Sequence, residues 1–220
     1  MKPLILAVDT TREHGSVALA RGLEMVEEMA LDAPSGFGQV IFRLLEELLG
    51  RNGVGLGDIE CFAAASGPGS FTGVRVGLAC VKGLAEALGK PAVAVSNLEA
   101  VASCGTAALR APVLDARRGE VYGAVYDSDG RMVAPEAVAR LPVWLEGLPA
   151  ADLEFVYCGW RPDLAGTRFA KSLVTAAPPA LAAAIVRIAA ARYERGEAGD
   201  PAALDANYVR RSDAELFWKD

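Results

Sequence analysis

Histidine is nearly absent from this chain, which has a single histidine, His14, among its 220 residues. Zinc sites of the HExxH type need two histidines, so a metallopeptidase centre cannot be assembled from this sequence. A serine or cysteine nucleophile with a histidine base would also depend on His14, and nothing in the sequence places it beside a nucleophile. We interpret His14 as a solvated turn residue, and we predict neither a metal site nor a catalytic residue.

Cysteine is also sparse, and long apolar runs are missing. The four cysteines stand singly in apolar stretches without CxxC spacing, and we interpret them as reduced core residues. They are Cys61, Cys80, Cys104 and Cys158. The apolar run before Asp9 is shorter than the roughly 7–15 residues of a signal-peptide core, and no stretch approaches the about 18 apolar residues of a membrane span. These features predict a cytoplasmic protein with no membrane partner.

Basic charge is in the minority, because 22 Lys and Arg face 28 Asp and Glu, for a formal net charge of −6. A protein that binds nucleic acid on its own normally presents a basic face. Any contact with nucleic acid would therefore need a partner. Hydrophobic residues are plentiful at 52%, which is enough to bury a core.

The apolar runs and turn residues predict the element order β-β-β-α-β-α-β-α in the first 109 residues. This is the plan of a ribonuclease H-like domain, a mixed sheet with helices on its faces. The expected strands are 4–8, 16–20, 24–31, 59–65 and 91–95. The expected helices are 38–49, 72–88 and 98–109.

The opening arrangement then recurs, which indicates an internal duplication. An apolar strand, a terminal Asp115, a polar turn and a hairpin strand repeat the pattern around Asp9. We therefore predict an α/β fold of two ribonuclease H-like halves, the first at 1–109 and a degenerate second at 110–204, which includes a helix at 180–193. Such a pair resembles the superfamily of acetate and sugar kinases, Hsc70 and actin, in which ATP lies between the halves.

That superfamily makes a small-molecule kinase the alternative function. Asp9 and Asp115 could bind Mg²⁺ in such a cleft, although aspartates at strand ends also cap turns. A Gly-rich adenosine loop is not evident, since its nearest candidate, Cys158-Gly159-Trp160, contains a bulky tryptophan. Catalysis by this chain alone is therefore not expected.

A Gly-rich stretch, SGPGSFTGVRVGLACVK at 66–82, precedes and enters the second helix. It does not fit a P-loop, because Gly73 is followed by Val74 and Arg75 instead of Lys and Ser or Thr, and it lacks the GxSxG nucleophile pattern. We predict that Ser70 or Thr72 caps the helix, and that Gly73 and the later Gly77 allow close helix packing. Anion binding at the helix N-terminus is the alternative.

The stretch from Ser66 to Ala102 is very similar to the signature of the TsaB (YeaZ) family. Further matches are AVDTT at 7–11, SVAL at 16–19, LDARRGEVYGAVYD at 114–127 and NYVRRSDAE at 207–215. The resemblance implies a non-catalytic scaffold that binds and activates the transferase TsaD, which threonylcarbamoylates the tRNA adenosine next to the anticodon. It also implies that 205–220 packs back on the first half.

The resemblance further implies the partners and the ligands. The ATPase TsaE joins the pair, tRNA is reached only through the complex, and the isolated chain forms a homodimer. No cofactor belongs to this chain alone, since ATP or ADP and metal belong to the partner subunits or the shared interface. A nucleotide at that interface would meet Thr10, Thr11, Ser70 and Arg75.

By the same resemblance, the helices at 38–49 and 72–88 meet those of the transferase in a four-helix arrangement. The expected partner-binding residues are Phe42, Leu45, Leu49, Gly73, Arg75, Gly77, Leu78, Ala79, Lys82 and Glu86. Ordinary core is the alternative for Phe42, Leu45 and Leu49, and a solvated face for Arg75, Lys82 and Glu86. We expect Leu45→Asp or Leu78→Asp to abolish binding without unfolding the chain. One departure from the family is that 34–39 reads PSGFGQ where members often carry His-Ser.

Overall fold

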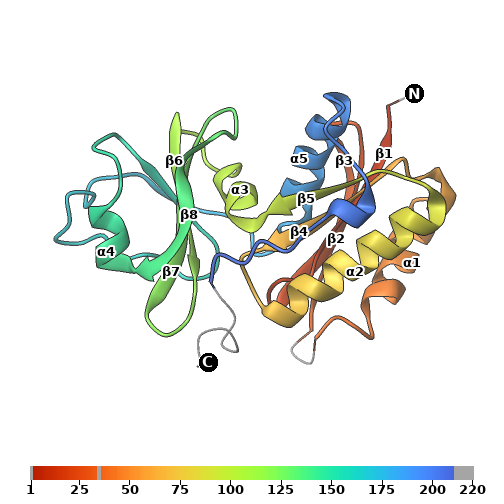
Figure 1. Cartoon of the computed structure of the whole chain (residues 1–220), viewed down its shortest axis with the longest axis horizontal. Helices are drawn as coiled ribbons and strands as arrows, with labels where there is room; N and C mark the ends of the chain where they lie inside the picture. Colours follow the sequence, from red (N-terminus) through yellow and green to blue (C-terminus); the bar gives the residue numbers. More distant parts are fainter. Residues whose placement is uncertain (1, 34–35, 211–220) are drawn as a thin grey trace, which may run out of the picture. The chain divides into compact units, whose positions relative to one another are not determined.

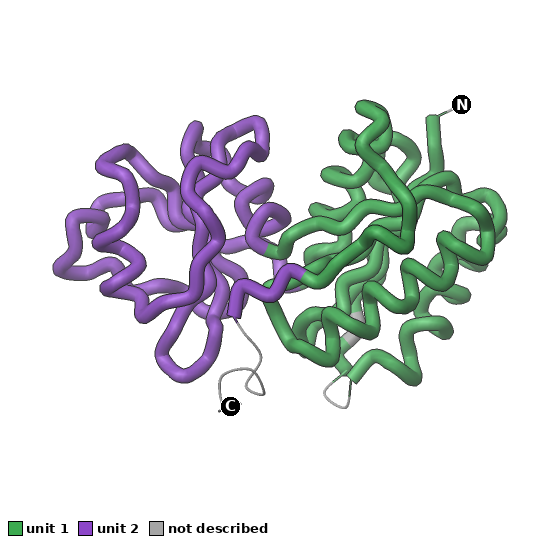
Figure 2. The backbone as a smooth tube through the Cα atoms, in the orientation of Figure 1, with its two compact units in different colours: residues 1–97, 180–206 green, residues 98–179, 207–220 purple. Residues whose placement is uncertain are grey.

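A computed structural model describes residues 2–33 and 36–210 of the chain. The chain divides into two compact units (Figure 2). Unit 1 comprises the residues up to Asn97 together with Ala180–Ala206. Unit 2 comprises Leu98–Pro179 and the described residues from Asn207 onward. Each unit contains one five-stranded sheet.

The sheet of unit 1 has the strand order β3-β2-β1-β4-β5 (Figure 1). Its first three strands form an antiparallel meander, and β4 and β5 run parallel to β1. Every residue of β1 is buried, as expected for a central strand covered on both faces. The strands are β1 (Leu4–Asp9), β2 (His14–Arg21), β3 (Glu24–Asp32), β4 (Cys61–Gly67) and β5 (Ala92–Ser96).

Helices cover this sheet on both faces (Figure 1). They are α1 (Ile41–Arg51), α2 (Phe71–Leu88) and α5 (Ala182–Glu194). The apolar sides of α1 and α2 share one core with Leu6 and Val8 of β1. Because side chains alternate along a strand, Ile5 and Ala7 face the other side, where α5 packs on β1, β2 and β4. Unit 1 is thus a three-layer sandwich.

The helix α5 was expected in the second half, and the structure places it in unit 1 instead. Its N-cap residue, Leu181, has no side-chain hydrogen bond. The acceptors come from the meander, since Ser16 Oγ accepts from the Ala182 N–H at 3.0 Å and Glu28 Oε1 accepts from the Ala183 N–H at 2.8 Å. The predicted halves, 1–109 and 110–204, therefore differ from the two units in two places: residues 98–109 belong to unit 2, and residues 180–204 belong to unit 1.

Unit 2 repeats the strand plan of unit 1, because its sheet has the order β10-β9-β6-β7-β8. Again three strands form an antiparallel meander and two follow in parallel. The strands are β6 (Leu109–Asp115), β7 (Glu120–Asp127), β8 (Met132–Arg140), β9 (Glu154–Tyr157) and β10 (Val174–Ala176). This shared plan confirms the duplicated fold.

The helices of unit 2 are short. They are α3 (Asn97–Ala102), which begins at the unit boundary, and α4 (Leu141–Glu146). The predicted helix 98–109 is therefore too long, and β6 begins at Leu109. The core is aromatic, since Phe155 makes edge contacts with Trp144 and Phe169 at centroid distances of 6.1 and 5.2 Å.

One buried charge ties the α3–β6 connection to this sheet. Glu154 of β9 is 1% exposed, and its carboxylate accepts from the N–H groups of Thr106 and Ala107 and from the Thr175 hydroxyl, each at 2.6 Å. Burial favours a raised pKa for Glu154, but these hydrogen bonds and the charge of Arg110 outweigh it, so the pKa is lowered.

The C-terminal segment follows the prediction that 205–220 packs on the first half only at 205–206, which belong to unit 1. Residues 207–210 belong to unit 2, where Arg210 donates to the carbonyl of Ala116 at 2.8 Å and Asn207 donates to Glu136 at 2.5 Å. The rest of that prediction, at 211–220, lies outside the described residues. Among the helices of the described residues, none is both long and apolar enough to cross a membrane.

Candidate functional site

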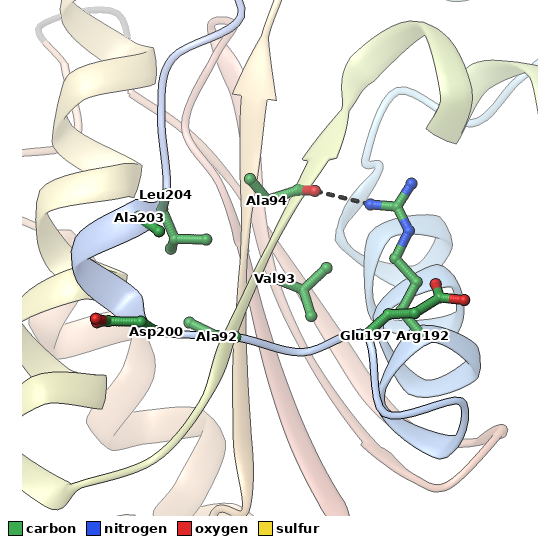
Figure 3. Close-up of a pocket in the computed structure, with 9 residues that line it drawn as sticks. Ala92, Val93, Ala94, Arg192, Glu197, Asp200, Ala203 and Leu204 are labelled. Carbon is green, nitrogen blue, oxygen red and sulfur yellow. Dashed lines mark hydrogen bonds between the residues drawn. The ribbon is translucent and has the colours of Figure 1, made fainter.

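A hollow of about 450 Å³ lies beside β5, the edge strand of unit 1 (Figure 3). None of the predicted site residues lines it. The strand edge there is already partly occupied, because Arg192 donates to the Ala94 carbonyl at 2.8 Å and Ala92 pairs through its backbone with Gly199. The candidate sites are therefore the turn after β1 and the outer faces of α1 and α2.

The glycines of the connection from β4 to α2 bring this helix against the turn after β1. A Cβ added to Gly73 would lie 2.0 Å from the Thr10 carbonyl oxygen, and one added to Gly69 would lie 2.7 Å from that of Thr11. The Thr10 hydroxyl donates to the Gly73 carbonyl at 2.7 Å, and a Cβ on Gly77 would approach the same hydroxyl. These glycines thus allow contact with a strand-end turn, and not with a neighbouring helix as expected.

The cap of α2 agrees with one of the two predicted residues. Ser70 is the N-cap, and its side chain accepts from the Gly73 N–H at 3.3 Å. The Ser70 N–H in turn donates to the Thr11 carbonyl at 2.7 Å. The predicted nucleotide-contact residue Ser70 therefore serves to join α2 to the turn after β1.

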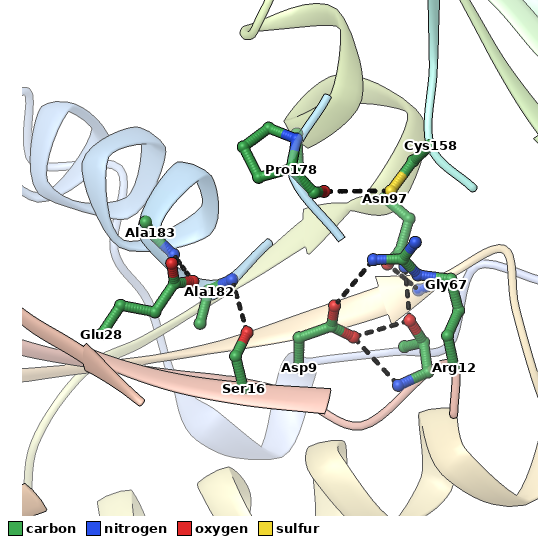
Figure 4. Close-up of polar contacts among 12 residues, drawn as sticks. Asp9, Arg12, Ser16, Glu28, Gly67, Asn97, Cys158, Pro178, Ala182 and Ala183 are labelled. Atoms are coloured by element: carbon green, nitrogen blue, oxygen red, sulfur yellow. Dashed lines mark hydrogen bonds and ion pairs between the residues drawn. The ribbon is translucent and has the colours of Figure 1, made fainter. Parts of the chain in front are cut away.

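Asp9 organises the interior of that turn (Figure 4). Its Oδ1 accepts from the Thr11 N–H at 2.9 Å and from the Thr11 hydroxyl at 2.6 Å. Asn97 donates to the same hydroxyl and accepts from the Gly67 N–H at 3.3 Å. Asp9 thus caps its turn, which was the structural alternative to a magnesium ligand.

This network also fixes the positions of two predicted nucleotide contacts. Thr10 and Thr11 are 2% and 1% exposed, and both hydroxyls are hydrogen-bonded within unit 1. Their side chains therefore do not line an accessible site. The Oδ2 of Asp9 is buried without a hydrogen-bond partner, and the Arg12 guanidinium lies 3.7 Å away. Among the described residues, no group of three or more His, Cys, Asp and Glu could hold a metal ion.

The predicted partner-binding residues of α1 divide between the core and the surface. Leu45 and Leu49 are buried in the core of unit 1, whereas Phe42 is 59% exposed. Core was the alternative interpretation for the two leucines, and the structure supports it. Only Phe42 is available to a partner.

The predicted residues of α2 divide in the same way. Leu78 and Gly77 are buried, and Gly73 is half-buried against Thr10. Lys82 is half-buried and donates to the Ala202 carbonyl at 3.2 Å. The outward-facing members are Arg75, Ala79 and Glu86.

Phe71 was missed by the sequence reasoning. Phe71 is 43% exposed at the start of α2, and the Arg75 guanidinium lies 3.8 Å from the centroid of its ring in a cation–π contact. The spacing of four residues on a helix was the signal that could have found it. We use the name outer face for Phe42, Phe71, Arg75, Ala79 and Glu86.

The stretch at 34–39, where the sequence departs from the family, contributes a buried residue. Phe37 is 4% exposed, and a Cβ on Gly15 would lie 2.2 Å from its ring. Phe37 thus covers the start of β2. The start of the stretch, at 34–35, lies outside the described residues.

The shared strand plan of the two units defines the class of protein. It is the duplicated ribonuclease H-like fold of the acetate and sugar kinases, Hsc70 and actin. An example is the activator of 2-hydroxyisocaproyl-CoA dehydratase from Clostridium difficile, with a TM-score of 0.53, 9% identity, and coverage of 88% of this chain and 97% of the activator. At that identity the likeness shows the fold alone.

More similar proteins show the family. The family model of tRNA N6-adenosine threonylcarbamoyltransferase, TsaD, matches residues 33–191. The tRNA threonylcarbamoyladenosine biosynthesis protein TsaB of Bacillus subtilis is 31% identical and aligns with 97% of each chain. The solved YeaZ of Pseudomonas aeruginosa has a TM-score of 0.74 and 28% identity, over 94% of this chain and 99% of that one. The chain belongs to the TsaB (YeaZ) family of TsaD-like proteins, in tRNA threonylcarbamoyladenosine biosynthesis, which confirms the resemblance.

Proposed function

We propose that this chain is a non-catalytic scaffold that binds TsaD and activates it for threonylcarbamoylation of the tRNA adenosine next to the anticodon. The observation that carries the proposal is the strand-end turn of unit 1, which is filled by the chain's own side chains. Asp9 Oδ1, the Thr11 hydroxyl and the Asn97 amide are joined there by hydrogen bonds, and the Thr10 hydroxyl donates to the Gly73 carbonyl of α2. Similarity to TsaB over almost the whole chain supports the same function.

In this proposal the outer face binds the transferase. It combines an exposed phenylalanine on α1 with an aromatic–arginine pair and a small residue on α2, and partner surfaces are enriched in aromatic residues and arginine. The same face joins two copies of the chain when the transferase is missing. The ATPase TsaE completes the assembly, and tRNA, nucleotide and metal are bound by the complex or by the partner subunits.

Sedimentation velocity on the full chain, alone and with its cognate TsaD, tests the proposal. We expect a homodimer that is replaced by a one-to-one heterodimer on mixing. Phe42→Glu and Ala79→Arg should each weaken the heterodimer at least about tenfold, because a charge or a long side chain enters a packed interface. Their unfolding midpoints should match the parent chain, since both side chains are exposed.

Leu23→Glu is the matched control, because Leu23 is 55% exposed in unit 1 but lies in the β2–β3 turn and not on α1 or α2. This variant should assemble like the parent. A chain that ignores TsaD, or that turns over ATP when purified alone, would refute the scaffold function. Equal weakening by Leu23→Glu and Phe42→Glu would refute the placement of the interface.

A further inference from the structure

Unit 2 carries a group of arginines and an exposed tryptophan on two neighbouring loops. Arg117 and Arg118 lie in the turn after β6, and Trp160 and Arg161 follow β9. Because β6 and β9 are parallel neighbours in the sheet, their carboxyl ends meet at one edge. We use the name arginine edge for these four residues. All four are exposed.

The backbone of the turn after β6 is unusual. Arg117 and Arg118 have φ values of 62° and 56°, and they are the non-glycine residues with positive φ in the described part of the chain. Glycine adopts this left-handed conformation without steric conflict, whereas residues with a Cβ do not. Residues in this conformation persist where the surrounding structure fixes them, and they cluster at functional sites. The turn after β6 is therefore a candidate binding site.

The turn is braced from within unit 2. The Arg117 N–H donates to Asp115 Oδ1 at 2.7 Å, and the Glu120 N–H donates to the Arg117 carbonyl at 3.0 Å. Arg210 donates to the Ala116 carbonyl and also pairs with Glu120. These bonds fix the backbone while the side chain of Arg117 remains 79% exposed. The turn thus presents its arginines outward on a fixed support.

The net positive charge of the arginine edge is modest. Asp115 lies 3.8 Å from Arg117 and offsets part of its charge. Arg118 and Arg161 add further positive charge. An edge of this kind gives weak electrostatic attraction on a chain with a net charge of −6. It suits a ligand that other subunits also hold.

We propose that the arginine edge contacts a strand of RNA, with phosphates on Arg117 and Arg118 and a base stacked on Trp160. Arginine contacts to phosphate and stacking on exposed aromatic rings are the two devices by which proteins hold single-stranded RNA. A small ligand needs enclosure on most sides, and a side chain that is 79% exposed does not provide it. The proposal rests on the scaffold function, which brings tRNA to the complex.

The test measures the affinity of an unmodified tRNA transcript for the assembled chain and TsaD at several salt concentrations. The double variant Arg117→Gly/Arg118→Gly removes both charges and keeps the turn, because glycine favours its conformation. We expect about a tenfold loss of affinity. The slope of log affinity against log salt should become shallower by roughly 0.7–0.9 for each phosphate that no longer meets an arginine. Trp160→Ala should weaken binding without changing that slope, and Trp160→Phe should restore it.

Arg131→Gly is the matched control. Arg131 is also 79% exposed and lies near an aspartate, Asp129, but it belongs to the β7–β8 turn at the opposite edge of the sheet. This variant should bind tRNA like the parent. Equal affinities for the double variant and the Arg131→Gly control would overturn the proposal. So would a loss of ATP binding with tRNA affinity unchanged, or a double variant that no longer assembles with TsaD.

Failure of the scaffold function gives a different result, because the unmutated chain itself would then not assemble with TsaD. In that case the RNA contact is tested on the full chain alone at low salt. RNA should quench the fluorescence of the parent chain more than that of Trp160→Phe. Equal quenching of the two chains would overturn the proposal.

Discussion

Removing the acceptors that cap α5 should loosen this helix from unit 1. In Ser16→Ala the buried Ala182 N–H loses its partner, which costs about 1–3 kcal/mol. In Glu28→Ala the Ala183 N–H loses a charged acceptor at the positive end of the helix, and loss of a cap costs about 0.5–2 kcal/mol. Because both bonds serve one helix end, we expect the double variant to lose about 2–4 kcal/mol of unfolding free energy.

Two measurements check this expectation. Urea unfolding followed by far-UV circular dichroism gives the change in free energy, and hydrogen exchange at the amides of Ala182 and Ala183 reports the helix end itself. Glu28→Gln is the control, because its amide oxygen can still accept the hydrogen bond, and it should lose less than Glu28→Ala. A double variant within about 0.5 kcal/mol of the parent, with unchanged amide protection, would refute the capping argument.

Three further predictions follow from buried or strained residues. Glu154 has a lowered pKa, so its contribution to stability is present above the ordinary pKa of 4.5 and is lost as the pH falls through the lowered pKa. The unfolding free energy of Glu154→Gln should not show this loss in acid. Identical dependence of the unfolding free energy on pH in the variant and the parent would contradict the prediction. Arg118→Gly removes the steric cost of a left-handed residue, which stabilises the fold by about 1–2 kcal/mol, but it adds entropy to the unfolded chain, which costs about 0.4–1 kcal/mol. We expect the unfolding free energy in urea to rise by about 0.5–1 kcal/mol. A fall in the unfolding free energy would show instead that the Arg118 side chain stabilises the turn. Leu45→Asp places a charge in the core of unit 1 and should cost roughly 3–5 kcal/mol of unfolding free energy. This is a large part of the stability of a typical domain, so the denaturant midpoint should fall strongly, whereas the sequence had led us to expect no loss of fold. Native circular dichroism and an unchanged midpoint would contradict the burial of Leu45.

Much of the fold could be predicted from the order of apolar runs. The meander β1–β3, the helices α1 and α2, and the recurrence at Asp115 all depend on local patterns of side chains and turn residues. The unit on which α5 packs could not be predicted, because the acceptors that cap this helix are Ser16 and Glu28, more than 150 residues away in the chain. An alanine-rich helix fits either sheet, and only these distant acceptors decide between them.

The candidate site was predicted less well for the same physical reason. Periodicity shows that α1 and α2 have apolar sides, but it does not tell which apolar residue lies against the sheet. Leu45 and Leu78 therefore looked available to a partner, although both are buried. The close approach of Gly73 to Thr10 joins residues 63 apart in sequence, so no local pattern contains it.

Because α5 belongs to unit 1, the segment 98–179 interrupts that unit in the sequence. During synthesis the ribosome releases the whole of this segment before α5 emerges. One face of the unit 1 sheet therefore stays uncovered long after its five strands have been made. Unit 2 lacks only the short segment from Asn207 at that stage. The second half to appear in the sequence therefore has the opportunity to fold before the first is complete.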